Sequence, residues 1–147
     1  MKTIRLILLL AALAGLFSPA QAAEHGRIQG ILISASNNHG ETDRRLAAYE
    51  PTLKRILRFE SYHFIGEDSA ALAGRETGHL ALGEEHQLEI TTESADGNGI
   101  HIRVRWTQGG HTLMNTGLVL RAGVPAVLGG PSTGRKGEVY AVILLGK

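Results

Sequence analysis

Hydrophobic and polar side chains alternate most regularly along residues 99–107, a pattern typical of a strand with one buried face and one solvated face. The apolar face carries Ile100, Ile102, Val104 and Trp106. The opposite face carries His101, Arg103 and Arg105. We expect Trp106 to anchor the core rather than stack on a ligand, because it shares its face with aliphatic residues.

Similar runs of branched and aromatic residues predict a chain built mostly of short strands. The other expected strands are 27–35, 59–65, 69–73, 78–82, 87–94, 112–120, 124–128 and 139–145. The last of them is apolar on both faces, so it should lie in the middle of the packed structure. The turn residues Asp96-Gly97 and Asn98-Gly99 favour an antiparallel hairpin.

Helical spacing of apolar residues is confined to residues 43–58. Pro51 interrupts it, and proline is tolerated only in the first turn of a helix. The sequence thus predicts one turn near 43–49 and a main helix near 51–58 that packs Leu53, Ile56 and Leu57 on the sheet. The expected fold class is α+β, mainly antiparallel β as a sandwich or open barrel-like sheet, with one N-terminal helix packed on it.

The first 22 residues have the organisation of a secretory signal peptide. Lys2 and Arg5 precede an apolar run over residues 7–17, and Ala20-Gln21-Ala22 supplies a small-x-small cleavage site. We expect cleavage after Ala22 and a single β-rich domain over residues 23–147. The expected location is periplasmic or secreted, with no membrane span after cleavage.

Composition narrows the possible functions. The chain has no cysteine, so it has no disulfide, thiolate nucleophile or cysteine-ligated metal. Residues 23–147 carry 13 of the 15 Lys and Arg residues and all 14 Asp and Glu residues, which gives a formal net charge of −1. A nearly neutral domain has no overall attraction for nucleic acid, and we expect no such partner.

The basic face of residues 101–105 should be neutralised locally. If residues 87–94 pair with it as a hairpin, Glu89, Thr91 and Glu93 stand on the same face of the sheet. Opposite charges then lie across neighbouring strands. We interpret this face as solvated rather than as a site for a polyanion.

The glycine-rich loop at residues 129–137 does not meet the requirements of a P-loop. Gly129 and Gly134 have the right separation, but Arg135 stands where the motif needs lysine. A strand rather than a helix follows, so no helix N-terminus would meet a phosphate. We interpret the segment as a connection between strands.

No catalytic or metal-ligand spacing is present in the sequence. There is no Gly-x-Ser-x-Gly elbow, and the seven histidines form neither His-x-His nor His-Glu-x-x-His. We therefore predict no catalytic residue, no metal site and no cofactor. Recognition is expected on the loops 36–43 and 129–137, because loops on rigid sheets usually carry it. The candidate binding residues are Asn37, Asn38, His39, Asp43, Ser132, Thr133 and Arg135.

Residues 115–130 resemble a segment of secretin-type β-domains, in which a strand, a Gly-containing turn and a short strand end in Leu-Gly-Gly. The strand–helix–strand at the start of the domain is similar to small ring-building modules of envelope secretion machines. The whole chain is similar to small exported bacterial proteins of a family without assigned activity. The resemblance implies an accessory role in the envelope, for example in a secretion or pilus-type system, and it transfers no catalytic residue.

The sequence therefore predicts an exported, non-catalytic binding or assembly module of the bacterial cell envelope. Its expected partner is an envelope protein, or a second copy of the chain joined through a sheet edge. One alternative is an exported metal-binding protein or hydrolase that uses His39, Asp43 and other histidines. Another is a carrier of a small ligand, which would need a cavity.

Overall fold

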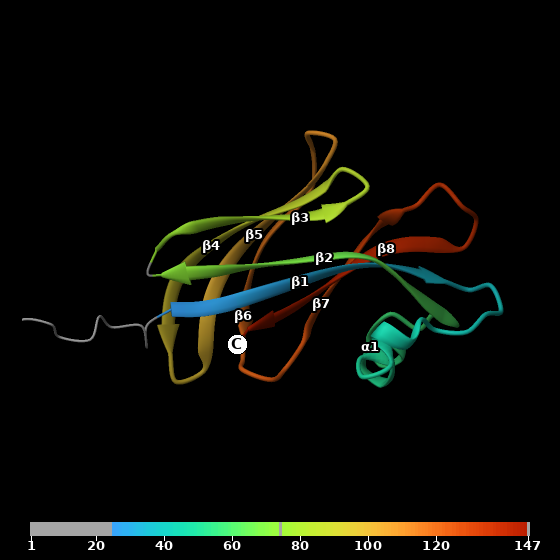
Figure 1. The fold of residues 1–147 in the computed structure, drawn as a ribbon, viewed down its shortest axis with the longest axis horizontal. Helices are drawn as coiled ribbons and strands as arrows, with labels where there is room; N and C mark the ends of the chain where they lie inside the picture. Colours follow the sequence, from blue (N-terminus) through green and yellow to red (C-terminus); the bar gives the residue numbers. More distant parts are fainter. Residues whose placement is uncertain (1–24, 74, 147) are drawn as a thin grey trace, which may run out of the picture.

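The computed structural model describes residues 25–73 and 75–146, which form two four-stranded antiparallel sheets packed face to face (Figure 1). The first sheet has the order β2-β1-β8-β7, and the second has the order β3-β4-β5-β6. The strands are β1 His25–Ser36, β2 Ser61–Ala73, β3 Thr77–Gly83, β4 His86–Asp96, β5 Gly99–Gln108, β6 His111–Leu120, β7 Ala126–Ser132 and β8 Glu138–Gly146. The expected antiparallel β architecture is confirmed, in its sandwich form.

We predicted an N-terminal helix, but the helix does not lie at the N-terminus of the fold. The α-helix α1, Glu50–Ile56, follows β1 and is preceded by the 3₁₀ turn Arg44–Leu46. Pro51 occupies the first turn of α1, where a backbone N–H would have no partner within the helix, so the lack of this group in proline costs no helical hydrogen bond. The predicted leader, residues 1–22, lies outside the described residues. Within them, no helix is long and apolar enough to cross a membrane.

Two predicted element boundaries were wrong. Residues 59–65 and 69–73 belong mainly to one strand, β2, because Gly66 continues the strand instead of turning it. A Cβ at Gly66 would collide with the backbone oxygen of Leu82, so glycine here serves a close approach of two backbones. In addition, β7 runs on to Ser132, which shortens the predicted 129–137 loop to residues 133–137.

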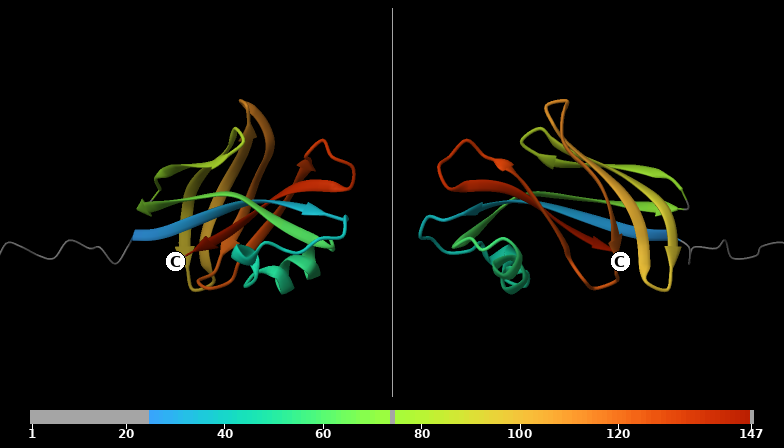
Figure 2. Two further views of the ribbon diagram at one scale, coloured as in Figure 1. Left: turned by 45° about the vertical axis from the view of Figure 1, so that its right-hand side comes forward. Right: turned by 180° about the vertical axis from the view of Figure 1, so that it is seen from behind.

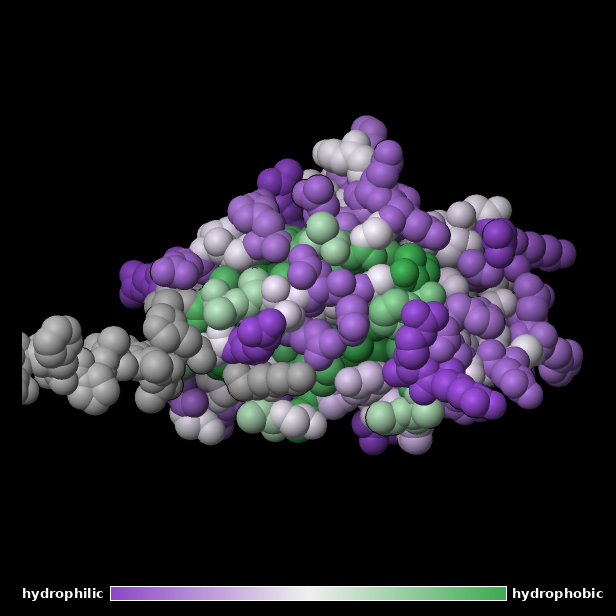
Figure 3. Space-filling view, viewed as in Figure 1, coloured by the Kyte–Doolittle hydropathy of each residue, from purple (hydrophilic) through white to green (hydrophobic). Residues whose placement is uncertain are grey.

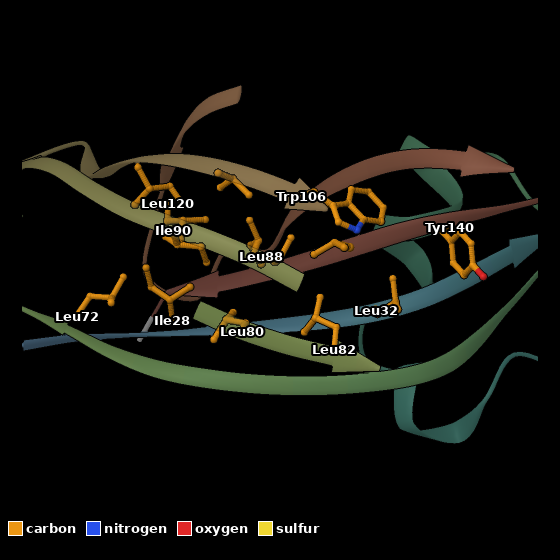
Figure 4. Close-up of a cluster of buried hydrophobic side chains, with 14 residues drawn as sticks. Ile28, Leu32, Leu72, Leu80, Leu82, Leu88, Ile90, Trp106, Leu120 and Tyr140 are labelled. Atoms are coloured by element: carbon orange, nitrogen blue, oxygen red, sulfur yellow. The ribbon is translucent and has the colours of Figure 1, made fainter. Parts of the chain in front are cut away.

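The two central strands of the first sheet, β1 and β8, are buried on both faces. One face meets the second sheet in a cluster that includes Trp106 and Tyr140 (Figure 4). The other face is covered by the helical segment, through the buried side chains of Leu46 and Leu53. β8 contributes Tyr140, Val142 and Leu144 to the first cluster and Ala141, Ile143 and Leu145 to the second. This double burial explains why β8 carries apolar residues on both of its faces.

The face predicted for the helix was partly wrong. Leu53 is fully buried and Leu57 packs against the second cluster, but Ile56 remains 48% exposed. The helix spans only seven residues, so it covers the sheet along a narrow stripe. Trp106 is fully buried, as the alternation of its strand predicted.

Candidate functional site

The two long sides of the sandwich are built differently. Along the side formed by β2 and β3, the closed side, Asp68 accepts a hydrogen bond from the Ala81 backbone N–H at 3.0 Å. Gly66 lies against the Leu82 carbonyl on the same side. In the view of Figure 3 hydrophilic side chains flank a band of hydrophobic ones. Because Asp68 of β2 accepts from Ala81 of β3, the exposed backbone of the edge strand β3 is partly occupied by a side chain from the other sheet.

Along the other side, β6 and β7 are the last strands of their sheets and are not hydrogen-bonded to each other. Half-buried hydrophobic side chains line this open side: Leu113, Met114, Leu118, Ala126 and Leu128. β6 contains no Asp, Glu, Lys, Arg or Pro over its ten residues. It therefore lacks the side chains that usually protect an edge strand from pairing with another chain.

The basic face of β5 is neutralised, as predicted. Arg103 donates to Glu93 at 3.1 Å, and the Arg105 guanidinium lies 3.7 Å from the Glu89 carboxylate. His101 lies 3.0 Å from the carboxylate of Asp96 instead of contacting the glutamates. These pairs are exposed, so they contribute little to stability but remove a positive patch from this sheet.

The two loops predicted to carry recognition meet at one end of the molecule (Figures 1 and 2). The Asn37 backbone N–H donates to the Gly137 carbonyl at 3.0 Å. Asn37, Asn38 and His39 are exposed, and the Asn38 N–H donates to the Ser36 hydroxyl at 3.1 Å. These residues therefore form a surface loop, which β1 and the neighbouring loop hold in place.

Asp43 has a structural role in this geometry. Its carboxylate caps the 3₁₀ turn by accepting from the Arg45 backbone N–H at 3.0 Å, and it also pairs with the Arg45 guanidinium at 2.8 Å. Hydrogen bonds from the Arg45 side chain, then from its backbone, hold the pKa of Asp43 at about 2. Both oxygens are engaged, so this residue offers no support for a shared ligand site with His39.

Two of the residues predicted in the 129–137 loop, Thr133 and Arg135, line a pocket of about 230 Å³ at this end, the loop-end pocket. Its other lining residues are Ser34, Ile65, Glu84, Glu138 and Tyr140. Ser132 is not among them, and its hydroxyl accepts from the Gly134 N–H at 3.1 Å. No local pattern pointed to the five additional residues, because they come from four separate segments of the chain.

Tyr140, which lines this pocket, contacts a deeper pair of side chains, His86 and Trp106. The Tyr140 hydroxyl donates to the Glu84 carboxylate at 2.9 Å, and its ring centroid lies 4.4 Å from that of His86. The indole N–H of Trp106 donates to Nδ1 of His86 at 2.9 Å. Burial, and then the bond to Glu84, raises the pKa of Tyr140. The pocket is thus linked through side chains to the centre of the core.

The bond from Trp106 fixes the tautomer of His86. Because Nδ1 accepts the indole proton, the neutral ring carries its own proton on Nε2. His86 is only 1% exposed, and Nε2 has no hydrogen-bond partner among the described residues. Burial lowers the pKa of His86, against the opposing effect of Glu84. A ring held in this state is poorly suited to bind a metal, since its free nitrogen is protonated.

Across residues 25–73 and 75–146, no group of three or more His, Asp or Glu side chains could hold a metal ion. No protein-family model, curated protein or solved structure matches the chain. Arguments about function therefore rest on the two features described above, the open side and the loop-end pocket.

Proposed function

We propose that this protein is a non-catalytic assembly module of the bacterial cell envelope, in which a second copy pairs with β6. The observation that carries the proposal is the uncharged edge of β6 beside half-buried hydrophobic side chains. An unpaired strand edge is a template for another strand, and main-chain hydrogen bonds supply much of the affinity in such pairings.

The composition of β6 favours a second copy as the occupant. Two β6 strands that meet antiparallel across a two-fold axis bring no Asp, Glu, Lys or Arg of these strands together. The guanidinium groups on the neighbouring strand β5, those of Arg103 and Arg105, already have carboxylate neighbours in their own chain. Such a pair would join two four-stranded sheets into one of eight strands.

The other edges favour a closed pair over a fibre. On the closed side Asp68 and Gly66 tie β2 to β3, so those edges are poorly accessible to a third chain. β7 contains Pro131, which donates no backbone hydrogen bond, and Gly129-Gly130, which weaken strand pairing. A two-fold interface uses the same patch on both copies and leaves no equivalent patch free.

The test is the oligomeric state of the chain purified after expression with its own leader, measured by sedimentation velocity over a wide range of concentration. We expect a monomer–dimer equilibrium that Asn115→Lys shifts toward monomer. Asn115 is exposed on β6, and a lysine on an edge strand opposes pairing by repelling its symmetry mate. The shift should exceed about tenfold in the dissociation constant, as for a like-charge pair in a protected interface.

Gln87→Lys is the matched control, because Gln87 is a neutral, exposed residue on the same sheet but on the inner strand β4. It adds the same charge away from the edge and should leave the equilibrium unchanged. A strictly monomeric wild type, or equal effects of the two lysines, would rule out pairing through β6.

A further inference from the structure

The loop-end pocket contains charges of both signs. Glu84 and Glu138 supply two carboxylates, and Arg135 supplies one guanidinium. Among the described residues, neither carboxylate forms an ion pair with Arg135. Hydroxyl groups of Ser34, Thr133 and Tyr140 complete the polar lining. These charged groups are held near one another without neutralising one another.

The turn that presents Glu84 is strained. Glu84 and Glu85 form the two-residue connection between β3 and β4, with φ angles of 50° and 65°. Such hairpins normally carry Asn-Gly or Asp-Gly, because other residues are disfavoured at positive φ. Strain of this kind concentrates at functional sites. Here it places a carboxylate against Tyr140 at the pocket, which Asn-Gly would not do.

The loop that presents Arg135 is organised by its own hydrogen bonds. The Arg135 backbone N–H donates to the Thr133 hydroxyl at 3.3 Å, and the Thr133 N–H donates to the Glu138 carbonyl at 3.2 Å. The Glu138 N–H donates in turn to the Arg135 carbonyl at 3.2 Å. The backbone positions of Arg135 and Glu138 are therefore set before any ligand binds, which reduces the entropy lost on binding.

The charges discriminate between classes of ligand. A metal cation would meet the guanidinium, and an anion would meet two carboxylates. A neutral sugar would cover all three charged groups without offering an opposite charge, and covering unpaired charges is costly. A ligand with two ammonium groups and one carboxylate would partner all three.

We propose that the loop-end pocket binds a free diamino acid such as L-lysine, with its carboxylate on Arg135 and its ammonium groups on Glu84 and Glu138. The pocket volume of about 230 Å³ is below the 300–1,000 Å³ usual for drug-sized ligands, which suits a single amino acid. The hydroxyl groups supply further hydrogen bonds to the ammonium and carboxylate groups.

The protein carries its own reporter for this binding. Trp106 is the single tryptophan of the chain, and it is joined to the pocket through His86 and Tyr140. A ligand that contacts Glu84 or Tyr140 changes the environment of Tyr140, and through His86 the environment of Trp106. We therefore expect saturable quenching or enhancement of tryptophan fluorescence when L-lysine binds.

The experiment is titration calorimetry, with fluorescence in parallel, on the full chain with three probes. They are L-lysine, cadaverine, which lacks the carboxylate, and L-norleucine, which lacks the side-chain ammonium. We expect one L-lysine per chain and binding of either analogue weaker by about tenfold or more, since each loses one charge-assisted contact.

The variant Arg135→Gln should weaken L-lysine by about tenfold or more without weakening cadaverine, because cadaverine has no carboxylate to lose and its two ammonium groups no longer meet the guanidinium. Glu138→Gln should weaken both. Lys136→Gln is the matched control, since it removes a positive charge from the same loop at a residue that does not line the pocket. It should leave all three affinities within about twofold.

Absence of saturable L-lysine binding to the folded wild type would overturn the proposal. So would equal losses in Arg135→Gln and Lys136→Gln, which would indicate general charge attraction, or equal binding of all three probes. The pocket and β6 share no residue, so this result is independent of whether the chain dimerises.

Discussion

Only one of the two ring nitrogens of His86 has a hydrogen-bond partner among the described residues. Its Nδ1 accepts from Trp106, while its Nε2–H is buried without a partner among the described residues. A buried donor without an acceptor costs about 1–3 kcal/mol. The ring is retained in spite of this cost, in contact with both Trp106 and Tyr140.

The state of His86 predicts how stability changes with pH. Its pKa in the folded chain lies below the ordinary 6.5, so at a pH below 6.5 the unfolded chain binds the proton more readily. The free energy of unfolding should be constant above 6.5 as far as His86 is concerned, and fall as the pH is lowered below it. Urea unfolding followed by circular dichroism at a series of pH values measures this.

His86→Gln provides the comparison, because it removes the titrating ring but keeps a polar side chain. It should abolish the part of the decline below pH 6.5 that His86 causes. The separate loss of stability that comes from protonation of Asp43 should remain, beginning below pH 3.8 and continuing toward about pH 2. Parallel curves for both proteins as the pH is lowered below 6.5 would show that His86 does not cause the decline.

Sequence reasoning at this scale succeeded for Trp106 and failed for His86. The position of Trp106 follows from alternation along a single strand, which is a local property. The importance of His86 depends on side chains 20 and 54 positions away in the chain, Trp106 and Tyr140. Nothing in the neighbouring sequence specifies those contacts.

Among the elements, β7 contains a pair of glycines of which only one is needed for the packing of the core. A Cβ at Gly130 would overlap the Trp106 indole, with Cζ3 at 2.7 Å and the Tyr140 carbonyl oxygen at 3.0 Å. A Cβ at Gly129 would meet only Leu57 Cδ2, at an ordinary 3.5 Å. Gly130 therefore makes room for the tryptophan, while Gly129 does not serve that packing.

We predict that Gly130→Ala lowers the free energy of unfolding by about 1–3 kcal/mol, the usual effect of overpacking a core. Gly129→Ala should be neutral or more stable by up to about 1 kcal/mol, because alanine restricts the unfolded chain. Urea unfolding of both variants at one pH makes the comparison. A smaller loss for Gly130→Ala than for Gly129→Ala would contradict the packing described here.

Most strands were predictable, since alternation and turn residues are local signals. The errors arose where distant contacts override them. Gly66 resembles a turn residue in sequence, yet it continues β2 because Leu82 approaches it from β3. Likewise, Thr133 and Arg135 were predicted to bind, but Glu84 and Tyr140 could be added only once the fold had brought them together.

At the scale of the whole molecule, the interior of the first sheet and the edge of the second should differ in stability. β1 and β8 pair with strands on both sides, whereas β6 has a partner on one side only. We predict the slowest hydrogen exchange at the amides of Ile31–Ile33 and Val142–Leu144, and much faster exchange along β6 at low protein concentration. Equal protection of β6 and β8 in the monomer would contradict this.

The central pair of the first sheet joins the first strand of the fold to the last, with Ile31 opposite Ile143. β8 supplies three buried side chains to each hydrophobic cluster. A nascent chain therefore cannot complete either cluster until β8 has been translated. Chains that end before Glu138 should remain sensitive to proteases, so that incomplete translation products are removed instead of accumulating as partly folded protein.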